Sequence, residues 1–485
     1  MKTIVLFHRL ELNTLFVPVG RALDSAGGVR VVHLAYGSEE LAQLRAAGIT
    51  GPVTVFKDEI RRLYRPGPVD PGDLAELDAF FLKGSKGAFN LNAALQSDRG
   101  FPLLSLDEAQ GLTLAYHRFW GEFLQRYGAD AVLHEPCTLM FNFVAAMHCA
   151  ARGGDYFYPI MAQGPGKGFN HLLMSGFDFT CPDLDRRLAE VAEGRRPVEP
   201  ETAARFLTEF RQSFQVFLGG VFRRPPLVRL AGAAVLQALR GRSRRRHLDR
   251  VFDNIDYWQT LQKPALTRLK NLIGYRRVRF DTFAPGEAYY FYPLHLEPEA
   301  VVLYHAHGIY ENQVKLIQNI AAQLPAGVRL YVKDHPHDQG YRACADYAAL
   351  RRVPNLRLLP AGVSGKEVTA HSLGVITLTG SAGFEALLLG KRVFTFAKTF
   401  YTSGPDVVCL RHVRDLRDAI EAAAARPTVT DEALHAYLTG YFAALHPGLT
   451  DYFAGRQNRY GIDLEANAVQ VAAGLREALQ AQDPT

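Results

Sequence analysis

The sequence predicts an α/β protein with two Rossmann-like domains. Short apolar runs typical of buried strands alternate with helical patterns in residues 1–180, and the same alternation returns after residue 284. The stretch between them, residues 181–284, has a long helical periodicity without a clear strand. We therefore expect two sheets of mainly parallel strands, separated along the chain by a helical insertion.

Length and composition agree with this class. The chain has 485 residues, of which 48% are hydrophobic and 21% charged, and its formal net charge is +6. Such a composition excludes a disordered chain, a collagen and a coiled coil. At roughly 150 residues per domain, the length fits about three units, or two large domains with an insertion.

The first domain, residues 1–180, begins with a βαβ pattern. We expect a strand over Thr3–Phe7, a helix over Leu15–Leu23 and a second strand over Val29–Leu34. A later apolar run, Ala131–Leu133, predicts a further strand, and the helical pattern behind it ends at a glycine pair.

The second domain, residues 285–425, repeats the alternation. A helix is expected over residues 312–324. Strands are expected over residues 289–294, 301–306, 328–333, 356–360, 374–379 and 392–396. Residues 426–485 are rich in alanine and predict C-terminal helices that pack back onto the rest of the chain.

The cysteines and the N-terminus indicate where the protein resides. The five cysteines are odd in number and have no CxxC spacing, which favours a reducing compartment. The N-terminal apolar run stops at His8, too early for a signal-peptide core, and no window approaches about 18 uninterrupted apolar residues. We expect a cytoplasmic protein without a membrane-spanning helix.

Polar residues follow three predicted strands of the second domain, at the edge where open parallel sheets bind ligands. The strand over residues 328–333 ends in Lys333 and runs into His335 and Pro336, which bring a cation and an imidazole suited to a phosphate. The simpler alternative is a His-Pro turn whose histidine only satisfies backbone groups.

The strand over residues 374–379 runs into Gly380, Ser381 and Gly383 and then directly into a helix. Glycines let a phosphate approach the backbone, and the dipole and unpaired N–H groups of a helix N-terminus favour negative charge. Ser381 adds a hydroxyl, and Glu385 is placed to reach a ribose. An ordinary serine-capped helix is the alternative, and the spacing matches neither the dinucleotide fingerprint nor the P-loop.

The strand over residues 289–294 is followed by His295 and Glu297 in a proline-bounded loop. No HExxH or Asp-x-Asp spacing accompanies these side chains. We therefore expect nucleotide contacts from this loop rather than a metal site.

Four short runs follow one another in this domain: Tyr-Pro-Leu-His-x-Glu-Pro-Glu-Ala, Lys-x-His-Pro, Thr-Gly-Ser-x-Gly-x-Glu-Ala and Gly-Lys-x-Val. In this order they resemble the bacterial capsule polysaccharide synthesis family. The resemblance covers about residues 290–410. The family contains Kdo (3-deoxy-D-manno-octulosonic acid) transferases, and its His-Pro motif is similar to that of sialyltransferases and polysialyltransferases that use CMP-sialic acid.

The resemblance implies a GT-B glycosyltransferase, in which two Rossmann-like domains face a cleft and the C-terminal one holds a CMP-sugar without a metal or other cofactor. By motif, His335 would contact the donor phosphate with support from Lys333, and Ser381 in its glycine turn would contact the phosphate or ribose. The full set of expected donor-site residues is Lys333, His335, Pro336, Gly380, Ser381, Gly383, Glu385, His295 and Glu297.

Glu297 is a departure from the family pattern. Members usually show Gln-Pro where this chain has Glu297-Pro298. Because a carboxylate cannot donate a hydrogen bond, we expect the contact made by this loop to differ.

Catalysis needs a second group besides those that stabilise charge on the donor phosphate. A base or a carboxylate nucleophile for the acceptor reaction is expected from the N-terminal domain. Glu135 is the leading candidate because it follows the strand Ala131–Leu133, although a solvated loop glutamate is the alternative. Other candidates are the acids Asp130, Glu11 and Asp107, and, for binding acidic sugars, the loop lysines Lys83, Lys86 and Lys167.

The insertion, residues 181–284, is strongly basic. Nine arginines and one acidic residue lie between Arg223 and Arg250, beside apolar stretches. This pattern fits a surface helix that attracts anionic lipid headgroups, or a solvated helix end, and nucleic-acid binding fits less well because no aromatic-rich RNA module is present. The residues expected to touch a membrane are Arg242, Arg244, Arg245 and Arg246.

Together these patterns predict a glycosyltransferase that moves an acidic sugar, with Kdo as the first expectation, from a CMP donor to a capsule or surface-glycan acceptor at the inner face of the cytoplasmic membrane. One alternative is a UDP-sugar transferase or nucleotide-sugar 2-epimerase. Another is a polysaccharide- or membrane-binding assembly factor without catalytic activity.

Overall fold

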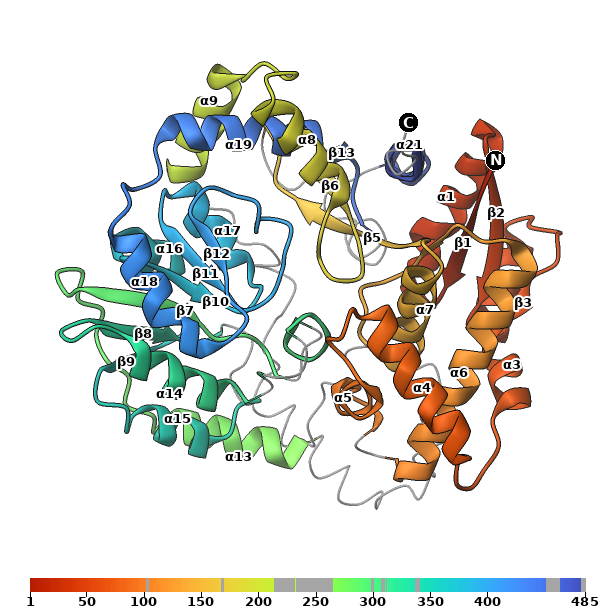
Figure 1. Cartoon of the computed structure of the whole chain (residues 1–485), viewed down its shortest axis with the longest axis horizontal. Coiled ribbons are helices and arrows are strands. Elements are labelled where there is room, and N and C mark those ends of the chain that lie inside the picture. The colour runs from red at the N-terminus through yellow and green to blue at the C-terminus, as the bar shows by residue number, and fades with distance from the viewer. Residues whose placement is uncertain are drawn as a thin grey trace. The chain divides into compact units, whose positions relative to one another are not determined.

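The structure is a computed structural model that describes residues 1–101, 104–166, 170–212, 232, 265–297, 301–306, 310, 312–335, 341–450 and 463–480. The chain divides into two units (Figure 1). Among the described residues, unit 1 is formed by residues 1–187 and 442–480, and unit 2 by residues 188–441. Both ends of the chain therefore belong to unit 1.

Unit 1 is built on a seven-stranded sheet with the order β13-β6-β5-β4-β1-β2-β3. Neighbours from β5 to β3 pair in parallel, whereas β6 and β13 are antiparallel to their neighbours. The strands are β1 (Lys2–His8), β2 (Val29–Ala35), β3 (Thr54–Val55), β4 (Ala131–Leu133), β5 (Asp155–Ala162), β6 (His171–Ser175) and β13 (His446–Pro447). The order of the five parallel strands is that of a Rossmann-like sheet.

The helices of unit 1 cover this sheet. They are η1 (Leu10–Leu12), α1 (Asn13–Ala26), α2 (Ser38–Ala46), α3 (Phe56–Leu63), α4 (Pro71–Gly84), α5 (Leu91–Ser97), α6 (Leu106–Tyr127), α7 (Met140–Ala151), α8 (Pro182–Ala192) at the border with unit 2, and α21 (Leu464–Gln480). Helix α6 begins at a Ser105–Glu108 capping box and ends at Gly128 in the left-handed region.

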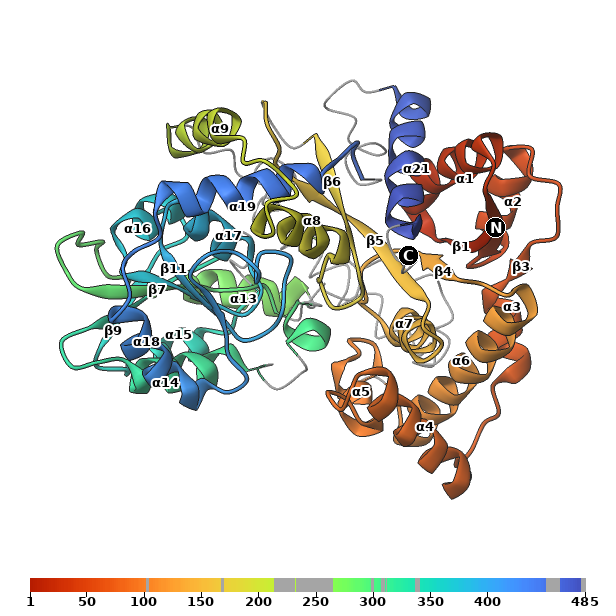
Figure 2. The ribbon, with the colours of Figure 1, turned by 45° about the horizontal axis from the view of Figure 1, so that its top comes forward.

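The C-terminal helix α21 packs against α1, and the two lie side by side in Figures 1 and 2. Val471 and Leu475 of α21 belong to the same buried cluster as Leu15 of α1 and Ile4 of β1. The expected return of a C-terminal helix onto an earlier part of the chain is therefore confirmed.

Unit 2 is built on a six-stranded parallel sheet with the order β12-β11-β10-β7-β8-β9. The strands are β7 (Tyr289–Pro293), β8 (Arg329–Lys333), β9 (Leu356–Leu359), β10 (Gly374–Thr377), β11 (Arg392–Thr395) and β12 (Val407–Cys409). Renumbered within the unit, this is the Rossmann strand order. The α/β class with two Rossmann-like sheets is confirmed.

The remaining elements of unit 2 flank its sheet. They are α9 (Pro200–Gln212), α13 (Ala265–Tyr275), η3 (Val301–His305), α14 (Gln313–Gln323), α15 (Cys344–Leu350), α16 (Gly365–His371), α17 (Ser381–Leu388), η4 (Val413–Asp415), α18 (Leu416–Ala424) and α19 (Asp431–Ala443). One core cluster joins the strands to α14, α15 and α18 through buried residues such as Ile317, Leu350 and Ile420.

One predicted strand is wrong. The sequence predicts a strand over residues 301–306, but Val301–His305 forms a short π-helix, η3. A short apolar run fits a buried strand and a buried helical turn equally well, so periodicity could not separate the two. The basic cluster Arg242, Arg244, Arg245 and Arg246 lies outside the described residues.

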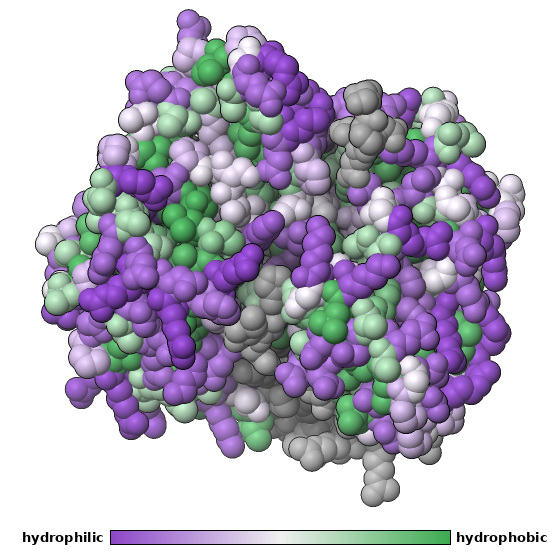
Figure 3. Space-filling view, viewed as in Figure 1, coloured by the Kyte–Doolittle hydropathy of each residue, from purple (hydrophilic) through white to green (hydrophobic). Residues whose placement is uncertain are grey.

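The described surface has few large apolar side chains. Leu82, Leu106 and Leu266 are among the exposed ones and come from separate elements. On the face in Figure 3, small hydrophobic groups lie scattered among hydrophilic residues. Of the helices that the structure describes, none has the length and hydrophobicity needed to cross a membrane.

Candidate functional site

The carboxyl edge of the unit 2 sheet contains the switch point of a Rossmann-like sheet. Strands β7 and β10 are neighbours at its centre, and the chain continues from β7 toward β8 on one side and from β10 toward β11 on the other. In open α/β sheets, ligands bind in the crevice beyond the strand ends at this point. The segments after β7, β8 and β10 are therefore the candidate site.

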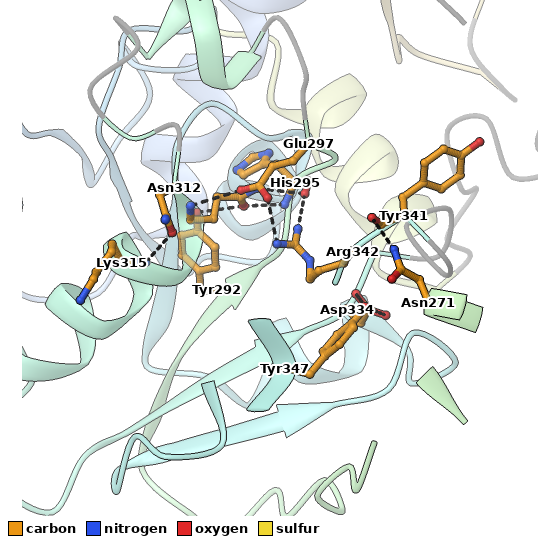
Figure 4. Close-up of polar contacts among 11 residues, drawn as sticks. Asn271, Tyr292, His295, Glu297, Asn312, Lys315, Asp334, Tyr341, Arg342 and Tyr347 are labelled. Atoms are coloured by element: carbon orange, nitrogen blue, oxygen red, sulfur yellow. Dashed lines mark hydrogen bonds and ion pairs between the residues drawn. The ribbon is translucent and has the colours of Figure 1, made fainter. Parts of the chain in front are cut away.

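The loop after β7 is held by a buried glutamine and a buried arginine. Gln313 accepts the backbone N–H of His295 at 2.9 Å and donates its amide to the His295 carbonyl at 3.0 Å. Arg342, whose side chain is 1% exposed, donates to that carbonyl and pairs with Glu297 at 3.0 Å. Figure 4 shows the Arg342 guanidinium directed at Glu297 and His295.

Both carboxylate oxygens of Glu297 are used within unit 2. Oε2 accepts from Arg342, and Oε1 accepts from the Gln313 side-chain amide at 2.7 Å and from the Gln313 backbone N–H at 3.2 Å. The side chain is 28% exposed. A contact between Glu297 and the donor stays a prediction.

His295 links this loop to β10. Its Nε2 accepts the N–H of Leu378 at 3.3 Å and lies 3.1 Å from the Thr377 hydroxyl. Because Nε2 accepts the Leu378 N–H, it must be unprotonated, so the Thr377 hydroxyl donates to it and Nδ1 holds the proton. Burial, with a smaller effect of Arg342, lowers the pKa of His295 to about 4. The ring is therefore neutral near pH 7.

The turn between β10 and α17 depends on two glycines. The N–H of Gly380 donates to Thr377 Oγ1 at 3.2 Å, and a Cβ on Gly380 would lie 2.8 Å from His295 Cε1. A Cβ on Gly383 would lie 2.5 Å from the hydroxyl of Tyr401, which itself donates to the Gly380 carbonyl at 2.6 Å. A side chain at either position would collide with these neighbours, so the two glycines let His295 and Tyr401 pack closely against the turn.

The N-terminus of α17 offers groups that suit an anion. Ser381, its first residue, is exposed, and no side chain of the described residues caps the helix. The first N–H groups of a helix have no partner within it and attract negative charge. Thr379 is 9% exposed, and its hydroxyl has no hydrogen-bond partner among the described residues. A bound oxyanion would satisfy both Thr379 and the helix N-terminus.

The end of β8 contributes a buried cation. Lys333 is 9% exposed and donates to the Asp334 carbonyl at 3.3 Å. Burial lowers the pKa of Lys333, and nearby carboxylates oppose this effect. Asp334 accepts the Tyr347 hydroxyl at 3.2 Å, and burial raises the pKa of Asp334. His335 is partly exposed, whereas Pro336 lies outside the described residues.

Glu385 lies one turn into α17 and is half-buried. Burial raises its pKa to about 8, against the opposing effects of Lys333 and Lys366. A carboxyl group with this pKa is largely protonated at pH 7 and can both donate and accept hydrogen bonds. That property suits the hydroxyl pair of a ribose, which stays a prediction for this residue.

In unit 1, the predicted catalytic Glu135 lies at the corresponding switch point, between β1 and β4. Glu135 follows β4, Arg9 follows β1, and the two form an ion pair of 2.7 Å with side chains 17% and 3% exposed. The Arg9 guanidinium also lies over the rings of Tyr36 and Phe141. The Tyr156 hydroxyl donates to the Glu135 carbonyl at 2.7 Å. Glu135 is thus held at the ligand-binding edge of its sheet.

The other candidates in unit 1 lie elsewhere or lie outside the described residues. Asp130 precedes β4 and accepts the Thr3 N–H at 2.7 Å, which places it at the opposite edge of the sheet. Asp107 lies in the first turn of α6. Lys83 and Lys86 are exposed near the end of α4. The side chain of Glu11 and all of Lys167 lie outside what the structure describes.

Sequence patterns did not identify Arg9, Gln313, Arg342 or Thr379 as site residues. Arg9 directly follows the first buried strand, which is the same signal that identified Glu135. Thr379 stands beside Gly380 in the motif. Gln313 and Arg342 are far from His295 in the sequence, and no local pattern marks their role.

Known proteins resemble this chain in part. The family model for capsule polysaccharide biosynthesis proteins matches residues 245–443, which include the whole unit 2 sheet. No protein of curated function matches the chain.

Solved structures of low identity also resemble the chain. The KpsC beta Kdo 2,7 transferase of Thermosulfurimonas dismutans shares 14% identity over 73% of this chain and 87% of its own, with a TM-score of 0.34. The UDP-GlcNAc 2-epimerase of Methanocaldococcus jannaschii shares 13% over 89% and 95%, with a TM-score of 0.24. The enzyme of that name from Neisseria meningitidis shares 12% over 99% and 100%, with a TM-score of 0.23.

The family match and the motif set point the same way. The matched region holds the three strand-end segments on which the resemblance was based, and these segments converge at one edge of the unit 2 sheet. This part of the chain, residues 245–443, is therefore similar to capsule polysaccharide biosynthesis proteins.

Proposed function

We propose that this protein is a glycosyltransferase that transfers an acidic sugar, with Kdo as the first expectation, from a CMP-activated donor to a capsule or related surface glycan. The observation that carries the proposal is the convergence of Lys333, His335 and the uncapped N-terminus of α17 at the switch point of unit 2. The match of residues 245–443 to the model of capsule polysaccharide biosynthesis proteins supports the glycan as the product class.

The chemistry of a CMP-sugar fits these groups. When the sugar leaves, negative charge grows on the CMP phosphate, and donors fixed in advance around that phosphate lower the barrier. Lys333 supplies a buried cation, His335 an imidazole, and the α17 turn backbone N–H groups. In this proposal the donor is a substrate, and no further cofactor is needed.

Glu135 is the proposed base or nucleophile for the acceptor reaction. A carboxylate can remove the proton of an acceptor hydroxyl or attack the anomeric carbon. Its ion pair with Arg9 fixes the carboxylate orientation, which such a role requires. The proposed membrane contact through the basic cluster at Arg242–Arg246 would place the enzyme near lipid-linked acceptors.

The proposal is tested by nucleotide binding. Thermal shifts of the full chain are measured with CMP, UMP, UDP and GDP, and a ligand at 100 times its Kd stabilises by about 2.7 kcal/mol. We expect CMP alone to raise the melting temperature. His335→Ala and Ser381→Ala should each weaken the affinity for CMP about tenfold or more, and so reduce this rise. His371→Ala is the matched control because His371 is exposed and precedes β10 at the opposite edge of the sheet.

Two outcomes would overturn the proposal. A preference for UDP would favour a UDP-sugar transferase or 2-epimerase. A well-folded protein that binds none of these nucleotides and does not turn over CMP-Kdo would favour an assembly factor without catalytic activity.

A further inference from the structure

A pocket lies within unit 1. It has a volume of about 600 Å³ and lies between α1, α2 and the first residues of α21. Its lining residues are Leu10, Asn13, Thr14, Val17, Pro18, Arg21, Glu39, Gln43, Leu464 and Glu465. We call it the α1–α2 pocket.

The α1–α2 pocket begins at the ligand-binding edge of the unit 1 sheet. Leu10 directly follows Arg9, the residue that pairs with Glu135. Leu10 has a φ of 47°, which a leucine adopts only when its surroundings enforce it. The buried carboxylate of Glu40 accepts the Leu10 N–H at 3.1 Å and the Gly37 N–H at 2.9 Å, and so holds this turn in place.

A chain of hydrogen bonds, buried at His33 and His8 and partly buried at Gln43, ends at the pocket wall. His33 Nδ1 lies 2.8 Å from His8 Nε2, and His8 Nδ1 lies 3.0 Å from Asn13 Oδ1. Because Asn13 Oδ1 is an acceptor, His8 donates from Nδ1 and accepts at Nε2 from His33. Asn13 then donates to Gln43 Oε1 at 2.6 Å. Because Oε1 of Gln43 is already used as an acceptor, the amide nitrogen of this lining residue is the group left to donate.

Both histidines in this chain are neutral. Burial lowers the pKa of His8 to about 3 and that of His33 to about 4. The direction of every hydrogen bond from His33 to Gln43 is therefore fixed near pH 7. A pocket whose donors are oriented before binding loses less entropy when a ligand arrives.

The lining chemistry selects the class of ligand. Arg21 contributes one positive charge and Glu39 and Glu465 two negative ones, and Arg21 lies 3.7 Å from Glu465. The pocket is therefore net negative and repels phosphates and sugar carboxylates. An uncharged sugar presents hydroxyl groups and C–H faces. The amide donors, the threonine hydroxyl and the carboxylate acceptors of the lining match the hydroxyl groups, and the aliphatic side chains match the C–H faces.

We propose that the α1–α2 pocket binds an uncharged sugar residue of the acceptor glycan. That this sugar belongs to the acceptor rests on the proposed function, whereas the binding of a neutral sugar in the pocket does not. Under this proposal, the two substrates bind at sites of different charge. The anionic donor sugar binds at the cationic site of unit 2, and the neutral acceptor sugar binds in unit 1.

Saturation-transfer NMR on the full chain tests the proposal. The probes are the methyl glycosides of glucose, galactose and N-acetylglucosamine, with Kdo and glucuronate as anionic comparators. We expect at least one neutral glycoside to bind and the anionic sugars not to bind in unit 1. Gln43→Ala and Thr14→Val should each weaken neutral binding about three- to tenfold. Gln96→Ala is the matched control, since Gln96 is an exposed glutamine of unit 1 on α5.

A charge variant sharpens the test. Replacing both Glu39→Gln and Glu465→Gln leaves Arg21 as the charged group of the pocket lining. Glucuronate should then bind measurably, while the affinity for the neutral glycoside changes less than about twofold. Equal or stronger binding of glucuronate to the unaltered protein would overturn the proposal, as would neutral binding that Gln43→Ala and Thr14→Val leave unchanged.

CMP thermal shifts on the same samples separate this proposal from the proposed function. Neutral sugar binding without nucleotide binding would support the α1–α2 pocket and refute the glycosyltransferase. CMP binding without any neutral sugar binding would refute the pocket alone.

Discussion

Glu297 is fixed by hydrogen bonds within unit 2. Its carboxylate accepts hydrogen bonds from both Arg342 and Gln313, so a glutamine at this position, which the family usually shows, would turn an N–H toward one of these donors. We predict that Glu297→Gln lowers the free energy of unfolding by about 1–3 kcal/mol, because a buried charged group loses its partner. Urea unfolding measures the change.

Glu421→Gln is the control for this substitution. Glu421 pairs with Arg417 on the surface of α18, with both side chains more than half exposed, and such a pair contributes little to stability. Equal effects of the two substitutions would mean that the Arg342–Glu297 pair does not fix the loop after β7.

Glu385 makes the stability of unit 2 depend on pH. Its pKa rises from 4.5 to about 8 on burial, so the folded protein binds this proton more tightly than the unfolded chain. The contribution is therefore fully present below about pH 4.5 and is lost as the pH rises toward 8. Glu385→Gln should be as stable as the unaltered protein near pH 4.5 and more stable by about 1–2 kcal/mol near pH 8.5, since partial exposure reduces the effect.

Unfolding curves at several pH values check this prediction. A parallel pH dependence of the two proteins would show that Glu385 titrates in the folded state as it does in the unfolded chain.

At the scale of elements, the β10–α17 turn is the most constrained part of the candidate site. Gly383→Ala would place a Cβ 2.5 Å from the hydroxyl and 2.7 Å from Cζ of Tyr401, which is fully buried and cannot turn aside. We predict a loss of about 1–3 kcal/mol in stability and a weaker CMP-induced thermal shift. Gly362→Ala is the control because a Cβ there meets nothing within 4 Å. Similar effects at both glycines would contradict the packing explanation.

Sequence patterns predicted most strands and helices of the two sheets because those segments are long or flanked by turn residues. The exception, residues 301–306, is a short apolar run that forms η3. For the candidate site, too, sequence patterns identified the residues that stand next to a predicted strand. Glu135, His335 and Ser381 were expected because each follows a strand, whereas Gln313 and Arg342 act on His295 across more than one element. Contacts of that range depend on tertiary packing, which no local pattern contains.

At the scale of the whole molecule, unit 1 depends on the last described helix. Leu475 of α21 is fully buried in the cluster that includes Leu15 and Leu6. We predict that Leu475→Ala lowers the stability of unit 1 by about 2–5 kcal/mol. Hydrogen exchange should accelerate in β1 while β8 of unit 2 stays protected.

Leu350→Ala, in the core of unit 2, is the reciprocal control. It should accelerate exchange in β8 and leave β1 unchanged. Equal acceleration in both strands by either variant would show that the two units unfold as one.

Because unit 1 contains both the N-terminal and the C-terminal segments of the chain, it cannot be completed on the ribosome until the end of synthesis. Residues 1–187 emerge first, but α21, which covers α1, is made only after all of unit 2. At about 5–20 residues per second, the apolar face of α1 waits roughly 20 s to 1.5 min for its partner. During that time unit 2 can fold by itself, while the first half of unit 1 remains a client for chaperones that recognise exposed apolar helices.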